Sequence, residues 1–435
     1  MNEAWKLGVA DAARAIARRE LTPSALVEAV LTRIDRVDRD VTAWVRLARE
    51  SALKQAATLT SEAAAGRLRG ALHGVPLGIK DIIATANLEM NVGSPLLAGY
   101  IPKEDAPLVR RLRAAGAIVL GKTHMTEFAA MDPAPTRNPW NLAHTPGGSS
   151  SGSAAAVAAF LVPGSVGTQT AGSILRPAAY CGIVGLKPTY GAVDRTGVFP
   201  CAWSMDHVGP MARSVEDVAL LFSVLAGTAL EFSQEKRLRI GIADRYFGDN
   251  ADADTRRAFD SVVEQLERSH AQIVPLKLSK SFEAGVDAGI VTMYSEMAAA
   301  HRERYAAHRD RYGWKLSCLL DAGGKVSAAD YLRAQQVRKV FKHELSVLFS
   351  EVDCMITPTT PAPAPKGLGA TGDWTQNLPF SSSGHPALTL PVALSAGGMP
   401  IGVQLAARHG GEAQLIRCGS FVERLVNFKH EAPCH

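Results

Sequence analysis

The sequence predicts an α/β fold in which helices cover both faces of a large mixed, mostly parallel β-sheet. Strand-like and helix-like patterns alternate between residues 66 and 145, and strand patterns return after residue 350. Such alternation is typical of βαβ units and a largely parallel sheet. The chain has 435 residues, of which 47% are hydrophobic, so it is long enough to bury a large core.

Residues 1–65 are predicted to form a helical segment that packs on this core. The clearest helix begins at Thr22 and Pro23, because proline is favoured in the first turn of a helix. Its apolar residues recur at helical spacing: Leu26, Val27, Val30, Leu31 and Ile34. A second helix is expected over residues 50–65.

The next part of the chain supplies the first strands. Residues 76–83 and 117–120 are predicted strands, with a helix over 106–115 between them. Lys80 lies in an apolar strand, so its side chain is expected to point into an interior lined by apolar groups. Open α/β sheets build their sites at one edge of the sheet, and we expect the loop 127–131 close to that edge.

The rest of the chain continues with helices and ends with strands. A polar connection over residues 227–236 is the best internal boundary, and the charged run 301–311 is interpreted as a solvated helix face. The remaining predicted elements are helices at 215–226, 251–268 and 411–428, a mainly helical region at 282–348, and strands at 239–243, 352–357, 387–394 and 400–407.

Residues 146–177 contain two serine-bearing glycine turns, at 147–149 and 171–173, on either side of a helix of small residues. The helix is expected over residues 153–161 and would rise roughly 15 Å. An extended return over residues 165–170 would cover about 20 Å. The chain therefore predicts that the second turn lies beside the first.

Ser150 and Ser151 are suitable N-caps for this helix. The start of a helix leaves unpaired backbone N–H groups and a partial positive charge, here beside the hydroxyls of Ser149 and Ser173. Such an environment favours chemistry in which negative charge develops.

The stretch 146–177 resembles the amidase signature of serine amidohydrolases. The resemblance continues in the segments 73–82, 121–129, 136–141, 180–200, 204–214, 379–394 and 398–416. It implies the amidase signature fold, with residues 66–435 as the catalytic domain and a variable helical region at about 245–350.

The resemblance also implies a catalytic triad of Ser173 as the nucleophile, Ser149 as the bridging serine and Lys80 as the base. It implies a non-proline cis peptide bond between Gly148 and Ser149. A serine hydroxyl is a poor nucleophile until a neighbouring base takes its proton. A lysine can be that base if desolvation or nearby positive charge lowers its pKa enough to leave it neutral.

The backbone N–H groups of Thr170, Ala171, Gly172 and Ser173 are the candidate oxyanion hole. Donors of this kind typically contribute ~3 kcal/mol each to transition-state stabilisation. Ala171 stands where glycine is commoner in the family, which narrows the backbone freedom of the turn.

Two departures from the family bear on the substrate. Gln169 stands where an Asp is common, and Leu175 where an Arg is common, so both charges of a possible pair are missing together. Arg176 could supply part of the lost role or hold a carboxylate on the substrate. Ala129 and Met131 are predicted to line the acyl pocket.

The predicted function is hydrolysis of the C–N bond of a small carboxamide through an acyl-enzyme on Ser173. One alternative is the glutaminase (A-type) subunit of a tRNA-dependent amidotransferase, which would pass ammonia to a partner. A second is a non-catalytic binding relative, which is disfavoured because all three triad positions are filled. Aliphatic, aryl and urea-like amides stay open as substrates, as does ester hydrolysis.

Composition excludes several other classes of function. The net charge of +5 comes from interleaved acidic and basic residues, so direct nucleic-acid binding is not expected. Six cysteines without a CxxC pair indicate reduced thiols in a cytoplasmic protein. No run approaches 18 apolar residues, so a membrane span is not expected. The twelve histidines lack metal-ligand spacing, so no metal or other cofactor is predicted. A small amide is the expected partner, and a homodimer stays open.

Two glycine-containing stretches allow a phosphate-binding interpretation. The loop 147–153 has no lysine at its end, which a P-loop requires. Residues 116–123 do match the P-loop spacing, but the four intervening residues are apolar and mostly strand-forming. We interpret this second match as a buried strand.

Overall fold

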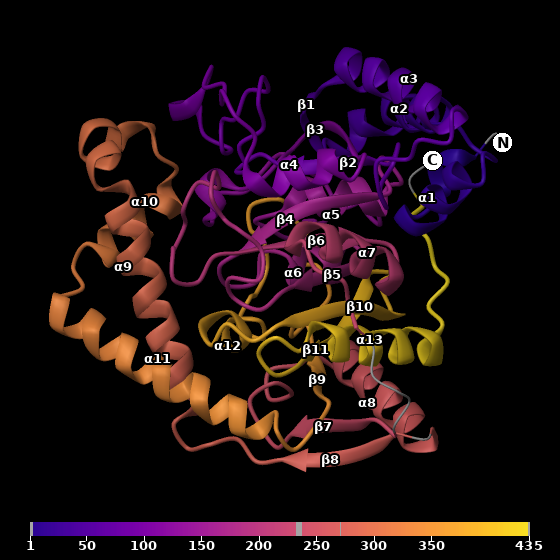
Figure 1. The fold of residues 1–435 in the computed structure, drawn as a ribbon. Helices are drawn as coiled ribbons and strands as arrows, with labels where there is room; N and C mark the ends of the chain where they lie inside the picture. The colour runs from indigo at the N-terminus through magenta and orange to yellow at the C-terminus, as the bar shows by residue number, and fades with distance from the viewer. Residues whose placement is uncertain (1–2, 232–236, 270, 434–435) are drawn as a thin grey trace.

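In the computed structural model, which describes residues 3–231, 237–269 and 271–433, one sheet of 11 strands runs through the centre of the molecule (Figure 1). The strand order is β1-β3-β2-β4-β6-β5-β10-β11-β9-β7-β8. The strands are β1 (Trp44–Leu47), β2 (Pro76–Lys80), β3 (Ile118–Thr123), β4 (Gly164–Gln169), β5 (Val184–Lys187), β6 (His207–Ala212), β7 (Arg239–Ala243), β8 (Gln272–Leu276), β9 (Cys354–Pro358), β10 (Ala387–Leu394) and β11 (Pro400–Ala406).

The predicted α/β fold with a large mixed sheet is confirmed, but the sheet is not mostly parallel. Of the ten strand pairings in the described chain, six are antiparallel. Parallel neighbours need a long crossover connection, whereas β10 and β11 are joined by a short turn and pair antiparallel. Parallel pairing is kept around β2, between β3 and β4, where Lys80 ends its strand.

Helices pack on both faces of the sheet (Figure 1). Ser165 of β4 donates to the carbonyl of Ser153 in α5 at 2.9 Å, whereas a side chain on the preceding Gly164 would meet Leu221 of α7. Successive strand residues point to opposite faces, so α5 and α7 lie on opposite sides. The helices are α1 (Val9–Ala17), α2 (Pro23–Val41), α3 (Arg49–Ala64), α4 (Pro107–Ala114), α5 (Ser151–Ala158), α6 (Leu175–Tyr180), α7 (Val215–Ala226), α8 (Ala253–Arg268), α9 (Phe282–His308), α10 (Trp314–Gly323), α11 (Ala328–Leu348), α12 (Leu378–Ser382) and α13 (Glu412–Val426).

The N-terminal segment contains a strand that its helical pattern did not predict. The helix α2 begins as expected, with the Thr22 side chain accepting a hydrogen bond from the N–H of Ala25 at 3.1 Å. Between α2 and α3, however, the four residues of β1 pair antiparallel with β3 at the edge of the sheet. A strand of this length, with strong helical periodicity on both sides, is not detected from the sequence pattern.

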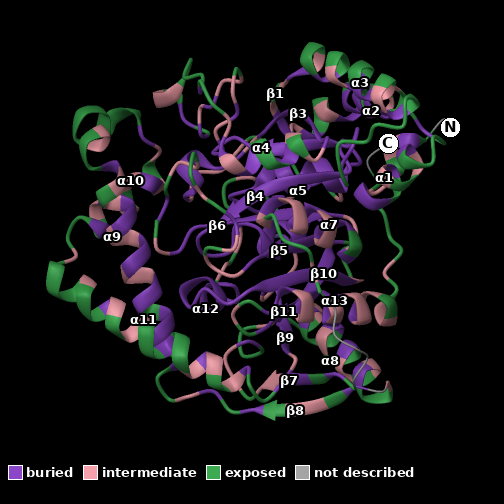
Figure 2. Cartoon of the chain, viewed as in Figure 1, coloured by how far each residue is buried: buried purple, intermediate pink, exposed green. Residues whose placement is uncertain are grey.

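The helices α9, α10 and α11 form an arm at one side of the molecule, and green, exposed residues mark its outer surface (Figures 1 and 2). The arm confirms the mainly helical region predicted at residues 282–348. The interpretation of residues 301–311 as a solvated face is wrong at His301, which has 0% exposure. Its Nδ1 lies 2.9 Å from the hydroxyl of Tyr312, and its ring meets Phe128 edge-on. One residue of the run turns inward because the arm packs against the loop that carries Phe128.

Two further expectations from the sequence can be placed in the fold. The P-loop match at residues 116–123 falls on β3, all of whose residues are buried, which confirms the strand interpretation. The proposed boundary at residues 227–236 lies partly outside the described residues. Among the described helices, none combines the length and apolar character needed to cross a membrane.

Candidate active site

Lys80 lies at the carboxyl end of β2, in the interior of the sheet, and its side chain has 0% exposure. Its Nζ atom is 2.7 Å from the Oγ of Ser149. The same atom is 2.8 Å from Oγ1 and 3.3 Å from the carbonyl oxygen of Thr168, a residue of the neighbouring strand β4. Lys80 therefore has three polar contacts and no carboxylate among them.

Burial lowers the pKa of Lys80 from its usual value to about 7, because the protonated amine loses its hydration inside the protein. Cys201 and Asp206 act in the opposite direction, and the positive charge of Arg176 adds to the lowering. An amine with this pKa is neutral in a large fraction of molecules near neutral pH.

The first serine turn is fastened to β4 by Ser150, and Ser151 closes the turn on itself. Ser150 occupies the N-cap position of α5, but its hydroxyl does not cap the helix: it donates to the carbonyl of Thr168 at 3.2 Å. The hydroxyl of Ser151 donates to the carbonyl of Gly147 at 2.7 Å. Ser150 therefore holds the predicted N-cap position, but the prediction is wrong for Ser151, and neither hydroxyl caps the helix because each bonds a carbonyl of the strand β4 or of the turn.

The second serine turn, between β4 and α6, lies beside the first, as the chain lengths predicted. The carbonyl oxygen of Ser173 accepts a hydrogen bond from the N–H of Ser150 at 3.3 Å. Ser173 is 8% exposed, and within the described residues its Oγ makes no hydrogen bond. The structure thus brings Lys80 and Ser149 into contact and places Ser173 in the adjoining turn, with its hydroxyl unbonded.

The backbone of the second turn presents free donors. Within the part of the chain that the structure describes, the N–H groups of Thr170, Ala171, Gly172 and Ser173 donate to no protein acceptor. Buried backbone N–H groups without a partner are rare in folded proteins. A cluster of four such groups beside a serine is suited to hold an oxyanion.

Asp206 supports this turn and was not singled out from the sequence. It accepts a hydrogen bond from the hydroxyl of Thr170 at 2.6 Å and from the N–H groups of Cys201 and Ala202 at 3.0 Å each. Burial raises its pKa to about 6. The available signal was a carboxylate directly before the apolar strand β6, in a segment already included in the family resemblance.

Arg176 is buried beside both turns and binds backbone. Its Nε and Nη2 donate to the carbonyl of Gly148 at 3.1 and 2.6 Å, and its Nη1 donates to the carbonyl of Gly372. Burial lowers the pKa of Arg176 to about 10. The peptide bond between Gly148 and Ser149 is cis, as the resemblance implied. Arg176 therefore holds the residue that precedes Ser149.

A narrow cavity of about 40 Å³ opens beside Ser173. The three residues predicted to bind substrate, Ala129, Met131 and Arg176, all line it. The other lining residues are Ala130, Thr170, Ala171, Gly172, Ser173, Cys201, Met293, Tyr294, Met297, Leu319 and Trp374. Those from α9 and α10 were not predicted, because nothing in their local sequence shows that the arm folds over the second turn.

Comparison with known proteins agrees with this geometry. The family model described as Amidase matches residues 25–416. The chain belongs to the Amidase family. It is 33% identical to the A-type subunit of the glutamyl-tRNA(Gln) amidotransferase of Halothermothrix orenii, over 99% of both chains.

Solved structures of amidases share the fold as well. One described as an amidase has a TM-score of 0.90 and 32% identity, and the match covers 96% of this chain and 99% of that one. The native peptide amidase of Stenotrophomonas maltophilia has a TM-score of 0.86 and 30% identity, with both chains fully covered. As a member of the Amidase family, the chain acts on amide C–N bonds.

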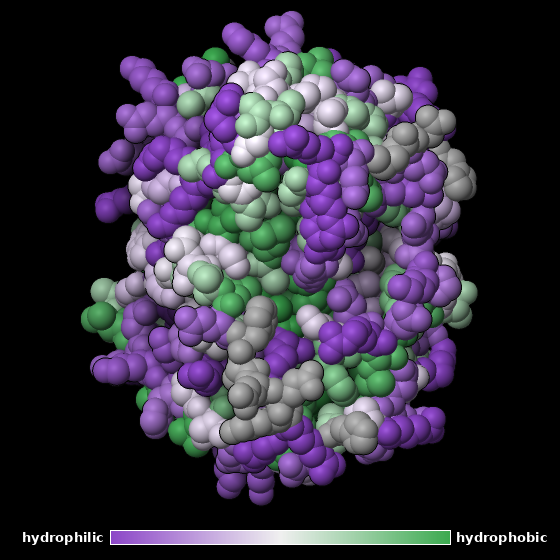
Figure 3. Space-filling model, turned by 45° about the vertical axis from the view of Figure 1, so that its right-hand side comes forward, coloured by the Kyte–Doolittle hydropathy of each residue, from purple (hydrophilic) through white to green (hydrophobic). Residues whose placement is uncertain are grey.

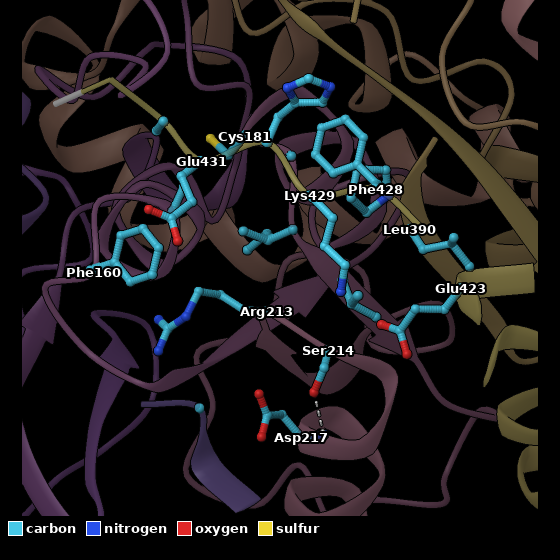
Figure 4. A pocket seen from close by; sticks show the side chains of 18 of the residues that line it. Phe160, Cys181, Arg213, Ser214, Asp217, Leu390, Glu423, Phe428, Lys429 and Glu431 are labelled. Carbon is cyan, nitrogen blue, oxygen red and sulfur yellow. Dashed lines mark hydrogen bonds between the residues drawn. The ribbon is translucent and has the colours of Figure 1, made fainter. Parts of the chain in front are cut away.

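Two other pockets formed by the described residues of this Amidase family member do not contain the buried lysine and serine pair. A pocket of about 330 Å³ contains Arg213, Asp217 and Glu423 (Figure 4). These three charged groups already bind backbone: Arg213 donates to the carbonyls of Lys6 at 3.3 Å and Val162 at 3.0 Å, Asp217 accepts from the N–H of Ala10 at 2.8 Å, and Glu423 accepts from the N–H of Val215 at 2.8 Å. They hold the N-terminal segment against α7.

An apolar groove of about 760 Å³ lies between α1, α7 and α13, and the described residues that line it include no lysine. On the face that Figure 3 shows, hydrophobic residues gather in a depression bounded by hydrophilic ones. In the part of the chain that the structure describes, no group of three or more His, Cys, Asp or Glu side chains could hold a metal ion.

Proposed function

We propose that this chain hydrolyses the C–N bond of a small carboxamide, with Ser173 as nucleophile, Ser149 as bridging serine and Lys80 as base. The observation that carries the proposal is the contact of 2.7 Å between a fully buried lysine amine and the Ser149 hydroxyl. Of the three proposed catalytic residues, Ser173 is the one that lines the cavity.

The contacts of Lys80 fit a neutral amine. A neutral amine has two N–H donors and one lone pair, and Lys80 has three polar partners. The carbonyl of Thr168 can only accept, and its Oγ1 can also accept, so the two N–H groups are used there. In the neutral amine the lone pair is then left for Ser149, whose hydroxyl donates to it, whereas in the protonated amine Nζ donates to the Oγ of Ser149.

In the proposed reaction, Ser149 takes the proton of Ser173 as it gives its own to Lys80. The Oγ of Ser173 bonds to the amide carbon, and the carbonyl oxygen gains negative charge beside the free N–H groups of residues 170–173. As the C–N bond breaks, the proton returns through the same chain to the leaving nitrogen. Water then attacks the acyl carbon and gives a proton to the same chain of groups, and Ser173 regains a proton as its bond to the acyl carbon breaks and the acid is released.

The cavity favours an acyl group that is small and largely apolar. The side chains of Met131, Met293, Met297 and Leu319 supply much of its wall, and its described lining contains no carboxylate. The one cation among those residues is Arg176, which already donates to two backbone carbonyls. Met side chains adapt their shape to fill irregular gaps, which suits a narrow pocket for a compact group.

A second candidate is hydrolysis of glutamine as part of an amidotransferase. The sequence relatives named as A-type subunits of glutamyl-tRNA(Gln) amidotransferase support it, and they support it better than the small-amide hypothesis. Glutamine carries both an ammonium and a carboxylate, so its binding calls for charged partners. The described lining offers Arg176 for the carboxylate but no acid for the ammonium.

The test is release of ammonia by the purified chain alone, from glutamine and from a panel of small aliphatic and aryl amides. The proposal predicts turnover of at least one uncharged amide, and loss of that turnover in Ser173→Ala. Glutamine turnover that requires added partner proteins, with no turnover of any uncharged amide, would favour the amidotransferase instead.

A further inference from the structure

Gln169, the last residue of β4, is buried and uses both ends of its side-chain amide next to the second serine turn. Its Oε1 accepts hydrogen bonds from the N–H groups of Ile174 at 2.8 Å and Leu175 at 2.9 Å. Its Nε2 donates to the carbonyl of Ala171 at 3.0 Å and to the hydroxyl of Ser381 at 2.9 Å. One side chain therefore bonds the backbone on both sides of Ser173.

The bond to Ala171 also determines where Gly172 points its N–H. In a trans peptide unit the C=O and N–H groups are coplanar and point in opposite directions. The carbonyl of Ala171 is held by Gln169 and by a second donor, the Ser381 hydroxyl, at 2.6 Å. Neither donor is among the residues that line the cavity, so we infer that the carbonyl faces away from it and that the N–H of Gly172, which has no protein acceptor within the described chain, faces it.

We propose that Gln169 is a positioning residue that orients the Gly172 N–H toward the oxyanion formed during attack by Ser173. The proposal rests on the proposed hydrolysis at Ser173 and adds to it a residue that touches neither substrate nor reacting atoms. Preorganised donors are effective because they need not reorient when charge develops.

The chemistry of the site requires an amide at this position. A carboxylate could accept the two bonds from Ile174 and Leu175, but it has no donor for the Ala171 carbonyl and would repel it. An uncompensated buried carboxylate is also costly, and the aliphatic Leu175 offers it no positive charge. The Oε1 of Gln169 instead accepts from two N–H groups, and its Nε2 donates to two oxygens.

The decisive variant is Gln169→Glu, which keeps the shape and the acceptor oxygen but removes the donor. The readouts are the second-order rate constant for phosphonylation of Ser173 by a fluorophosphonate, and kcat and KM for an amide that the wild type hydrolyses. We expect the labelling rate and kcat to fall about tenfold or more while KM stays within about threefold, since removal of one oxyanion donor costs about 10²–10³ in kcat.

Gln404→Glu is the matched control. Gln404 is equally buried, and its Nε2 donates to the Thr357 hydroxyl at 3.0 Å and the Gln376 carbonyl at 2.7 Å, while its Oε1 accepts from Asn377, so none of these bonds is made to residues 170–175. Burying a carboxylate there should lower the thermal midpoint as well, but Ser173 should be labelled within about threefold of the wild-type rate. Equal slowing in both variants would reduce the role of Gln169 to stability and overturn the proposal.

Ser381→Ala provides a second route if Gln169→Glu does not fold. It removes one of the two donors to the Ala171 carbonyl and leaves Gln169 in place, so labelling should slow about threefold or more. Wild-type labelling rates in Ser381→Ala, or in a folded Gln169→Glu, would overturn the inference about Gln169 and leave the proposed function standing. A wild-type chain that is not labelled at Ser173 would instead refute the proposed function on which it rests.

Discussion

The Nζ of Lys80 and the Oγ of Ser149 lie 2.7 Å apart, although the two residues are 69 positions apart in the chain. Lys80 reaches this place because it ends a strand with parallel neighbours on both sides, and Ser149 because its turn is fastened to the strand β4. The contact joins a buried amine to a buried hydroxyl. Proton transfer between them is the step on which the proposed reaction depends.

Replacing Lys80 by Met should remove activity while leaving the fold intact. The change takes away the base, and general-base catalysis typically contributes 10²–10⁴ in rate, so kcat/KM should fall by about that factor. Lys187→Met is the matched control. Lys187 is also fully buried with a pKa lowered to about 7, but it binds the carbonyls of Pro188 and His385. Steady-state kinetics in which Lys187→Met loses as much activity as Lys80→Met would contradict the assignment of the base.

The rate of amide hydrolysis should rise with pH through about 7. The base must be neutral to accept a proton, and burial lowers the pKa of Lys80 to about 7. Below that pH the protonated form predominates, so log kcat/KM should increase with a slope near one and then level off. The measurement is kcat/KM from pH 5.5 to 9. A profile that is flat or falls across pH 6 to 8 would rule out a neutral amine as the base.

Ser149→Ala and Ser151→Ala should separate the bridging hydroxyl from its neighbour. Ser149 contacts Lys80, whereas the Ser151 hydroxyl is bonded to the carbonyl of Gly147. Loss of the Ser149 hydroxyl should lower kcat by about 10²-fold or more, because it interrupts proton transfer. Ser151→Ala should stay within about tenfold of the wild type. Comparable losses of kcat in the two variants would show that activity depends on the conformation of the turn and not on the Ser149 hydroxyl.

Met297→Ala should widen the range of accepted amides. Met297 lines the cavity and is buried on α9, so truncation should enlarge the space beside Ser173. The ratio of kcat/KM for a bulkier acyl group over acetamide should rise about tenfold, since a methylene in an apolar pocket is worth about 10–200-fold. The thermal midpoint should fall, because Met→Ala in a core costs about 2–5 kcal/mol. An unchanged substrate ratio would place the acyl group elsewhere.

The sequence predicted the parts of this site that are local or near in the chain. The Gly-Ser turns and the alanine-rich helix between them bring Ser149 and Ser173 side by side for reasons of length alone. The burial of Lys80 followed from its apolar strand, and its pairing with Ser149 from the family resemblance. The burial of Lys80 and the return of the second turn are encoded in the neighbouring chain, whereas the contact of Lys80 with Ser149 joins residues 69 positions apart and was implied by the resemblance alone.

Features that depend on tertiary packing escaped prediction. The strand β1 forms only because β3 offers it an edge, and the Ser150 hydroxyl turns to Thr168 only because β4 passes beside it. The pocket wall from Met293 and Met297 requires the arm to fold over the second turn. The bond that Gln169 makes with Ser381 joins residues 212 positions apart, which no local pattern records.

The most direct test is the site of acylation during turnover. The chain would be mixed with a substrate that deacylates slowly, quenched in acid within milliseconds, and analysed by intact mass and peptide mapping. We expect an added acyl mass on the peptide containing Ser173, absent in Ser173→Ala and formed at least about 100-fold more slowly in Lys80→Met. Turnover without any acyl mass on Ser173, or acyl mass on another residue, would contradict the proposed mechanism.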